Sequence, residues 1–158
     1  MSNEPFRLDI SAFVAKAKGD LHAITHRVVA DVASRIIERT PVGDPDLWAS
    51  RAPAGYVGGR ARSNWQLGIN VPVSGELYNA KDKGFPNASA TLAAITDRIP
   101  ADAGGKTYFI SNNLPYAQRL EDGWSSQAPR GMVHLAVIEW QQIIAAAAAD
   151  TTWQAPPA

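Results

Sequence analysis

The side chains best suited to chemistry or recognition gather in one stretch, from Ile110 to Met132, with the sequence ISNNLPYAQRLEDGWSSQAPRGM. The adjacent carboxylates of Glu121 and Asp122 could serve as a general acid and a general base. Consecutive residues on a helix point about 100° apart, so these two side chains do not converge by themselves. With Arg119 nearby, they fit a charged helix end. The mixture of aromatic, amide and charged side chains instead favours a surface that another protein covers.

The histidines offer a second candidate for chemistry. His22 and His26 are four residues apart, the spacing that turns two imidazoles toward a metal on one face of a helix. A catalytic zinc helix would carry a glutamate directly after the first histidine, where Ala23 stands. The pair also lies off the apolar stripe of its helix, so we expect both imidazoles in water on its flank. His134 has no partner that the sequence reveals.

The sequence Gly-Gly-Lys-Thr, from Gly104 to Thr107, is the closest approach to a phosphate-binding loop. Such a loop needs a further glycine where Pro100 stands, and it should open a helix, whereas the YFIS that follows is typical of a strand. We therefore expect a β-turn. The chain also lacks a Gly-x-Ser-x-Gly elbow and an acidic metal cluster, so the sequence predicts no enzymatic activity, no metal and no cofactor.

Charge and cysteine content exclude several classes of partner and site. The 15 basic and 15 acidic residues cancel, so no global field concentrates nucleic acid or an anionic membrane. The absence of cysteine excludes disulfides, thiolate metal sites and a cysteine nucleophile. The sequence starts with no basic leader and apolar run, and no stretch is apolar for long enough to span a membrane. We therefore expect a soluble protein made in the cytosol.

A cluster of arginines and aromatic residues precedes and enters the first predicted strand. Its members are Trp48, Arg51, Tyr56, Arg60, Arg62 and Trp65. Basic residues interleaved with aromatic ones can bind single-stranded nucleic acid through charge and stacking. Arginine, tryptophan and tyrosine are also enriched at protein interfaces, and three arginines in a neutral chain form only a modest patch. The pattern favours a protein interface and leaves nucleic-acid binding as the alternative.

The elements that must position these residues begin with a long helix. Between Asp9 and Arg39, apolar residues recur in steps of three and four at Ile10, Val14, Ala17, Leu21, Ile24, Val28, Val32 and Ile36. The stripe keeps its phase across Gly19, so it predicts one helix of about 45 Å, ended by Thr40 and Pro41. A helix of this length overhangs a small domain unless something else covers its end.

The rest of the chain is predicted to contain short elements separated by extended loops. We expect loops over 41–61 and 74–87, strands over 64–73 and 106–112, short helices over 88–98 and 114–122, and a long last helix over 131–150. Two long helices flanking a small antiparallel or mixed sheet define an α+β fold, here one domain over residues 1–150. Residues 151–158 are predicted to form a flexible C-terminal tail.

Three stretches, taken in order, resemble one protein family. They are Thr40-Pro41-Val42, then Gly59-Arg60-Ala61-Arg62-Ser63-Asn64-Trp65, then NNLPYA, LEDG and QAPRGM within residues 110–132. The resemblance is to the tail-component proteins of long-tailed bacteriophages, the tail-completion or neck proteins of the minor tail protein Z type. It spans about residues 9–150, and the order and spacing of the motifs carry it. The insertion from Gly43 to Gly58 departs from the family pattern.

The resemblance implies a structural virion protein that forms a ring of about six copies at the head–tail junction. Its partners would be further copies of itself, a tail terminator or tail tube protein, and a head-closure or connector protein. DNA would only pass through the lumen, and no membrane would be involved. The protein would be made in the host cytoplasm and reside in the neck or tail of the virion. Alternatives are a tail terminator or, outside virion proteins, a single-stranded nucleic-acid-binding module.

Residue types and the resemblance together predict which side chains meet other subunits. They are Trp48, Tyr56, Arg60, Arg62, Trp65, Tyr116, Arg119, Glu121, Trp124, Arg130 and Met132. The alternative left open is that Tyr116, Leu120 and Met132 pack against the sheet of their own domain. The loops 41–61 and 74–87 are expected to become ordered when neighbouring rings cover them.

Overall fold

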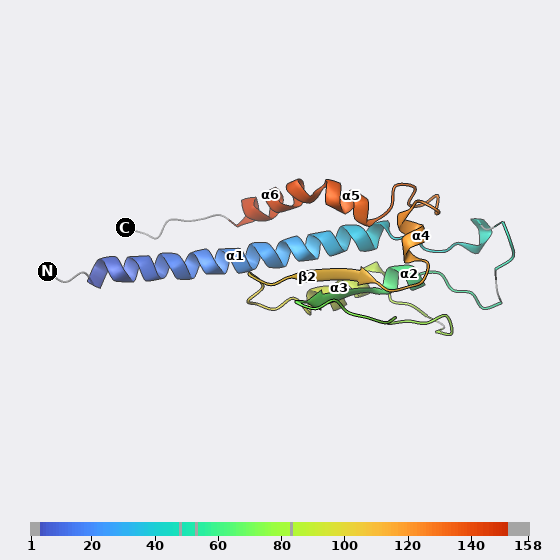
Figure 1. Cartoon of the computed structure of the whole chain (residues 1–158), viewed down its shortest axis with the longest axis horizontal. Helices are drawn as coiled ribbons and strands as arrows, with labels where there is room; N and C mark the ends of the chain where they lie inside the picture. The colour runs from blue at the N-terminus through green and yellow to red at the C-terminus, as the bar shows by residue number, and fades with distance from the viewer. Residues whose placement is uncertain (1–3, 48, 53, 83, 152–158) are drawn as a thin grey trace.

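The computed structural model describes residues 4–47, 49–52, 54–82 and 84–151, with side chains from Val14 onward. Its elements are α1 (Glu4–Arg39), the 3-10 helix η1 (Pro45–Leu47), α2 (Arg60–Ser63), β1 (Trp65–Ile69), α3 (Ala88–Thr96), β2 (Tyr108–Asn112), α4 (Ala117–Glu121), α5 (Val133–Ile138) and α6 (Trp140–Asp150). This confirms the predicted α+β fold, with a long N-terminal helix, a small antiparallel sheet and C-terminal helices (Figure 1).

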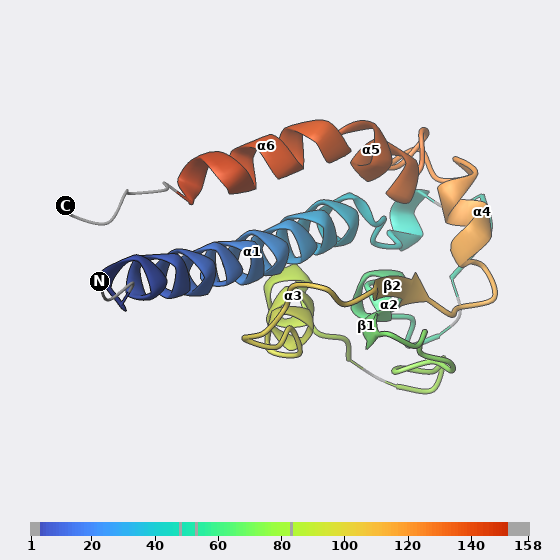
Figure 2. The same cartoon turned by 60° about the vertical axis from the view of Figure 1, so that its left-hand side comes forward.

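Helix α1 is a single rod of 36 residues, about 54 Å long at a rise of about 1.5 Å per residue. It begins before the predicted Asp9 and passes Gly19 without a break. Figures 1 and 2 show its N-terminal part projecting beyond the sheet and beyond α6. The overhang expected from the length of the apolar stripe is therefore present.

The C-terminal end of α1 is closed by hydrogen bonds around Thr40. The Thr40 hydroxyl donates to the Ile36 carbonyl at 2.7 Å and accepts the indole N–H of Trp65 at 2.7 Å. Arg62 donates to the Thr40 carbonyl from Nε at 3.1 Å and from Nη2 at 2.8 Å. A guanidinium at this position also opposes the negative end of the helix dipole. The predicted helix stop is thus the point where α1 is tied to the start of the sheet.

The sheet of the described chain consists of two antiparallel strands. β1 pairs with β2 from Trp65 opposite Asn112 to Ile69 opposite Tyr108. The two strands are separated in the sequence by α3 and two loops, so their pairing brings together segments that are distant in the chain. The antiparallel alternative in the prediction is the one realised.

Strand β1 is shorter than predicted, because the chain turns at Asn70 instead of continuing to Val73. Asn70 has a left-handed φ of 61°, and its Oδ1 accepts the Thr107 N–H at 3.0 Å. Beyond it the chain folds back over Gly68, where a Cβ atom would lie 2.3 Å from the Val71 carbonyl oxygen. Alternating apolar residues continue past the turn in the sequence, which is why the pattern overstated the strand.

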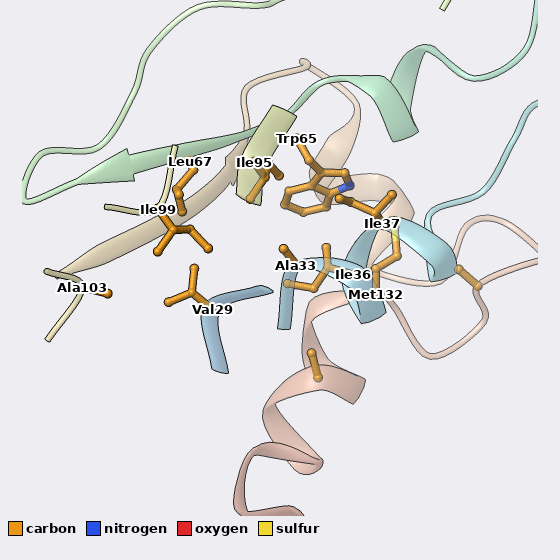
Figure 3. Close-up of a cluster of buried hydrophobic side chains, with 12 residues drawn as sticks. Val29, Ala33, Ile36, Ile37, Trp65, Leu67, Ile95, Ile99, Ala103 and Met132 are labelled. Carbon is orange, nitrogen blue, oxygen red and sulfur yellow. The ribbon is translucent and has the colours of Figure 1, made fainter. Parts of the chain in front are cut away.

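The main core lies where α1 faces the sheet and α3. Buried side chains come from α1 on one side and from β1, α3 and the segment after α3 on the other: Val29, Ala33, Ile36, Ile37, Trp65, Leu67, Ile95, Ile99 and Ala103 (Figure 3). Met132, which precedes α5, joins the same cluster. Burying each large aliphatic or aromatic side chain contributes about 1.5 to 3 kcal/mol, so this cluster holds the two strands against α1.

A second, smaller cluster holds the C-terminal helices on the other side of α1. Val28 is buried with Ile143 and Ala147 of α6, and Ile24 and Val32 pack at its edge. Figures 1 and 2 show α1 as the middle layer, with α5 and α6 on one side and the sheet with α3 on the other. The single apolar stripe of the sequence therefore serves two different neighbours.

The predicted last helix is interrupted at Glu139, between α5 and α6. The Glu139 carboxylate pairs with Arg35 and, at 2.6 Å, with Arg39, both on α1. The hydrogen bond from Arg39, with that from Arg35, holds the pKa of Glu139 below its ordinary value. The predicted continuous helix is thus divided in two at this residue, although Glu139 keeps its hydrogen bond to the Leu135 carbonyl. The apolar period of the sequence runs through this point and gives no sign of the interruption.

The two short helices that the sequence predicted are present at the expected places, but their lengths differ from the predicted ones. α3 begins after Asn87, whose Oδ1 accepts the Ala90 N–H at 2.9 Å. α4 occupies only the second part of the helix predicted over 114–122, and η1 and α2 lie within the region predicted as a loop. The predicted tail lies outside the described residues beyond Thr151.

Candidate functional site

A groove of about 720 Å³ is lined by segments next to the C-terminal end of α1. Figure 1 shows that α2 and α4, which lie in or beside this lining, are at the end of the molecule opposite the start of α1. The walls of the groove come from the segment after α1, the segment that leads into α2, the loop before α3, and α4 with the residues that follow it. Four side chains predicted as an interface line it together: Tyr56, Arg60, Tyr116 and Trp124. A concavity of this size with aromatic side chains in its lining has the character of a binding site.

Arg60 and Tyr116 lie together in one wall of the groove. The Arg60 guanidinium lies 5.8 Å from the centre of the Tyr116 ring, within the range of a cation–π contact. Its Nη2 pairs with Glu76 at 2.6 Å, and its Nε donates to the Tyr78 carbonyl at 3.1 Å. Arg60 is therefore held from three directions within the wall of the groove.

Tyr116 is half-buried in this wall, one turn before Leu120, which packs against the core. Burial raises the pKa of the Tyr116 hydroxyl; Arg60 lowers it, and Tyr56 and Glu76 raise it. The hydroxyl thus keeps its proton at neutral pH. It can donate or accept a hydrogen bond to a partner, but it is not set up as a base or nucleophile.

The inserted loop after α1 closes on itself at its base. A Cβ atom at Gly43 would lie 1.9 Å from the Tyr56 hydroxyl oxygen, and one at Gly58 would lie 2.3 Å from the Gly43 carbonyl oxygen. Gly58 therefore requires glycine, because the neighbouring atom is backbone, whereas a side chain at Gly43 would displace the end of the Tyr56 side chain. Partial burial raises the pKa of Tyr56. The loop that departs from the family pattern is packed here as one wall of the groove.

Two backbone-like hydrogen bonds join this wall to the opposite one. The Gln127 side chain donates from Nε2 to the Val42 carbonyl at 2.8 Å and accepts the Val42 N–H on Oε1 at 3.2 Å. The side-chain amide thus binds both the N–H and the carbonyl of Val42, as the backbone of a neighbouring β-strand would. It holds the segment after α1 next to the segment after α4, so the groove has a defined width.

Trp124 stands at the rim of the groove with 74% of its surface exposed. It follows Gly123, which has a φ of 82° and stands just beyond the end of α4. The guanidinium of Arg119 lies 5.2 Å from the Trp124 ring centre. An indole held by a cation and left in water is typical of residues that dominate binding energy at interfaces.

Asn64 is a determinant of the groove that sequence reasoning missed. It is fully buried, and its Nδ2 donates to the carbonyls of Arg60 at 2.8 Å and Tyr78 at 3.1 Å. Its Oδ1 accepts the N–H groups of Leu77 at 2.8 Å and Tyr78 at 3.1 Å. The side-chain amide has two donor hydrogens and two acceptor lone pairs, and all are used. Asn64 therefore fastens the loop after β1 to α2.

The loop after β1 has further anchors to the sheet. Gln66 donates from Nε2 to the Gly75 carbonyl at 2.8 Å, and Asn113 donates from Nδ2 to the same oxygen at 2.9 Å and to the Val73 carbonyl at 3.2 Å. We expected this loop to become ordered only under a neighbouring ring. The structure corrects this for residues 73–78, because the domain itself supplies the hydrogen bonds.

Glu121 is not a contact residue in the groove but the cap of α5. Its carboxylate accepts the N–H groups of Met132 at 2.8 Å, Val133 at 2.9 Å and His134 at 2.8 Å. Gly131 allows this approach, because a Cβ atom there would lie 2.5 Å from the Glu121 carbonyl oxygen. The adjacent carboxylates of the sequence motif thus serve structure, and they do not form an acid–base pair.

The capping role predicts a specific loss of stability at acid pH. Partial burial raises the pKa of Glu121, but the amides of Val133, His134 and Met132 outweigh it and hold the pKa below its ordinary value of 4.5. The contribution is therefore complete above about pH 4.5 and disappears as the pH falls through the lower folded-state pKa. We expect Glu121→Gln to cost about 1 to 2 kcal/mol at pH 7 and much less at pH 3, measured by urea unfolding.

Asp122→Asn is the matched control for this prediction, because it neutralises the neighbouring exposed carboxylate, whose partner is Gln118 at 3.0 Å. Its expected cost at pH 7 is within about 0.5 kcal/mol. An equal loss in the two variants, or a loss in Glu121→Gln that is the same at both pH values, would contradict the capping role.

The remaining predicted interface residues lie outside the groove lining. Trp65 and Met132 are only 5% and 2% exposed, so the prediction that their side chains face a partner is corrected: both pack in the core. For Met132 this decides the open alternative. Arg62 is bonded to the end of α1, and Arg130 is exposed elsewhere on the described surface. Trp48 lies outside the described residues.

Other candidate chemistry does not assemble in the part of the chain that the structure describes. No group of three or more histidine, aspartate or glutamate side chains converges there to hold a metal. His22 is half-buried and accepts the Gly104 N–H on Nδ1 at 2.9 Å, so the prediction that it is solvated was wrong. Gly104 and Gly105 lie in a turn, as predicted, and Lys106 binds Asp102 at 2.7 Å within the same segment.

Comparison with known proteins finds no family model, no curated protein and no solved structure that matches the chain. Among the described residues, no helix combines the length and apolar character needed to cross a membrane. Fold and site together define an α+β domain with a groove at one end that is lined in part by aromatic side chains.

Proposed function

We propose that this chain is a structural virion protein that forms a ring at the head–tail junction of a tailed bacteriophage. It would act by assembly and not by catalysis, joining the tail tube or terminator to the head connector. The ordered motifs T-P-V, G-R-A-R-S-N-W and those within residues 110–132 support the proposal through their resemblance to tail-completion proteins. Closed symmetry would set the copy number without an enzymatic step.

The groove is the observation that carries the proposal. It brings Tyr56, Arg60, Tyr116 and Trp124 together from separate parts of the sequence, and hydrogen bonds of the domain hold its walls. Tyrosine, tryptophan and arginine in a preformed concavity supply large contact area at small entropic cost. We propose that the groove receives a segment of the neighbouring terminator or head-closure protein.

The internal contacts of two arginines weigh against the nucleic-acid-binding alternative. Arg60 is paired with Glu76, and Arg62 donates to carbonyls at the end of α1. With 15 basic and 15 acidic residues, the chain also has no net charge to bind phosphates. Binding to single-stranded DNA at micromolar protein that weakens steeply with salt would favour the alternative.

The proposal is tested by the composition of virus particles. Particles purified from a lysate in which this protein is expressed are analysed by quantitative mass spectrometry, with the portal protein as the reference. We expect about six copies of this chain per particle, as a single ring requires. Absence from particles would remove the structural role.

The groove itself is tested by a change at its rim. We expect Trp124→Ser to leave the free energy of unfolding within about 0.5 kcal/mol of wild type, because the indole is 74% exposed, and to reduce head–tail joining at least about tenfold. Val71→Ser is the matched control, since Val71 is 68% exposed and lies outside the groove lining. Joining is counted by electron microscopy of lysates. Equal joining by the two variants would exclude the groove as the contact.

A further inference from the structure

The apolar stripe of α1 continues past the neighbours that cover it. Ile24 and Val28 pack against α6, and the same steps of three and four continue toward the N-terminus at Leu21, Ala17 and Val14. Leu21 is 53% exposed and Val14 is 43% exposed. These three residues, called here the α1 stripe, lie on the helix face that accepts α6 further along, because the spacing preserves the phase.

The cover that α6 gives this face stops where α6 stops. Beyond it, the turn at Gly104 touches the edge of Leu21, where a Cβ atom on Gly104 would lie 3.1 Å from the Leu21 Cγ, and leaves 53% of Leu21 exposed. Asp150, the last residue of α6, pairs with Arg27 of α1 at 2.5 Å. From Arg27 to Glu4, α1 runs on for about 35 Å. Figures 1 and 2 show this part of α1 extending beyond the end of α6. The α1 stripe is therefore a direct continuation of the interface between α1 and α6.

A second apolar stripe runs along one flank of α5 and α6, beside the buried face of Ile143 and Ala147. Val137 is 64% exposed, Trp140 44% and Ile144 37%. The Glu139 N–H still donates to the Leu135 carbonyl, and the Ile143 N–H to the Glu139 carbonyl, so the helical phase continues across Glu139 and the spacing of three and four places the three side chains side by side. These three residues are called here the outer stripe. Only Glu139 is charged between Val133 and Ala149, and its carboxylate is engaged by α1. The outer stripe thus presents an uncharged surface beside the face that α6 buries against α1.

We propose that a second copy of this chain lays its outer stripe along the α1 stripe of the first copy. Three α1 positions, Val14, Leu21 and Val28, are seven residues apart, so the α1 stripe repeats the surface that already accepts α6. The outer stripe repeats the spacing of the residues with which α6 contacts that surface. Trp140 and Ile144 are four residues apart, as are Ile143 and Ala147. An uncharged apolar surface selects such a partner over an acidic or basic one.

The two stripes differ, so each copy would offer one surface to each of two neighbours. Such head-to-tail contacts generate a ring when the rotation closes and a filament when it does not. The inference rests on the proposed function for this closure. The contact itself requires only that purified copies meet, so it can be tested without the virion.

The test uses sedimentation velocity of the full chain at rising micromolar concentrations. We expect concentration-dependent association of the wild type and mostly monomer for Leu21→Asp and for Ile144→Asp. Leu21→Asp retains an intact outer stripe and Ile144→Asp an intact α1 stripe, both of which are exposed in the monomer. An equimolar mixture of the two variants should therefore form a dimer with one copy of each, and no larger species.

Two control variants place the same charge on other sides of the same helices. Ala15→Asp lies about 100° around α1 from Val14, and Gln142→Asp lies about 200° around α6 from Trp140, and both positions are exposed. We expect both controls to associate like the wild type. Circular dichroism and urea unfolding of all four variants should match the wild type, which separates a lost contact from a lost fold.

Several outcomes would overturn the proposed contact. A wild-type protein that stays monomeric would do so. A protein that associates only after removal of residues 152–158 would do so as well, because this segment of its own chain would then be what covers the α1 stripe. If the Leu21→Asp variant associates with itself, the contact would be a symmetric one between two outer stripes. If the Ile144→Asp variant associates as strongly as the wild type, the outer stripe would be excluded from the contact. A monomeric protein that is nevertheless present in particles would leave the proposed function standing. A protein that associates through the two stripes but is absent from particles would support the contact and contradict the proposed function.

Discussion

Replacing Trp65 with alanine is expected to lower the free energy of unfolding by about 4 kcal/mol, the cost typical of truncating a core aromatic. Trp65 is 5% exposed and packs among side chains of α1 and α3 (Figure 3). Truncation leaves a cavity between the sheet and α1, and it also removes the indole N–H that binds the Thr40 hydroxyl at 2.7 Å. Urea unfolding monitored by circular dichroism measures the change.

Trp65→Phe separates the two contributions. Phenylalanine retains much of the apolar contact, and the Thr40 hydroxyl still donates to the Ile36 carbonyl, so only the indole hydrogen bond and a small volume are lost. We expect a cost of about 1 to 2 kcal/mol for this variant. A Trp65→Ala protein as stable as wild type, but unable to assemble, would restore Trp65 as the partner contact predicted from its residue type.

Replacing Asn64 with alanine is expected to cost about 3 kcal/mol and to loosen the groove. The change leaves the N–H groups of Leu77 and Tyr78 and the carbonyls of Arg60 and Tyr78 without the amide that pairs them. Each buried polar group that loses its partner costs about 1 to 3 kcal/mol, partly recovered when water enters. Urea unfolding gives the total, and hydrogen exchange of the Leu77 and Tyr78 amides should accelerate beyond the global change.

Asn113→Ala is the matched control for Asn64. Asn113 holds the same loop through the Val73 and Gly75 carbonyls, but it is only half-buried. Water can replace its hydrogen bonds, so we expect a cost of about 1 kcal/mol and little change at Leu77. Equal costs for the two variants would show that the burial of Asn64 does not matter.

The candidate site was predictable in part. Tyr56, Arg60, Tyr116 and Trp124 were selected by residue type and by the family resemblance, and the structure brings all four into one groove. Trp65 was selected on the same grounds and lies in the core. Aromatic side chains suit interfaces and interiors equally well, and the choice depends on which segments cover them.

The residues that shape the groove gave weaker signals. Asn64 stands between an arginine-rich turn and a strand and resembles any polar loop residue in sequence. Its four partners follow it in the chain by more than ten residues or precede it by one turn. The same holds for Glu121, whose three donors lie eleven to thirteen residues further on. Local patterns do not encode pairings of this separation.

By itself, the sequence determined the long helix, its end at Thr40, the approximate place of the two strands and the α+β class, because hydrophobic periodicity and helix-ending residues act within a few positions of one another. The tertiary structure alone decided where β1 stops, where the last helix is interrupted, and which aromatic side chains are buried. It also divided one apolar stripe of α1 into a part that α6 covers and a part that is exposed. Burial depends on neighbours from distant segments, and periodicity along one segment carries no record of them.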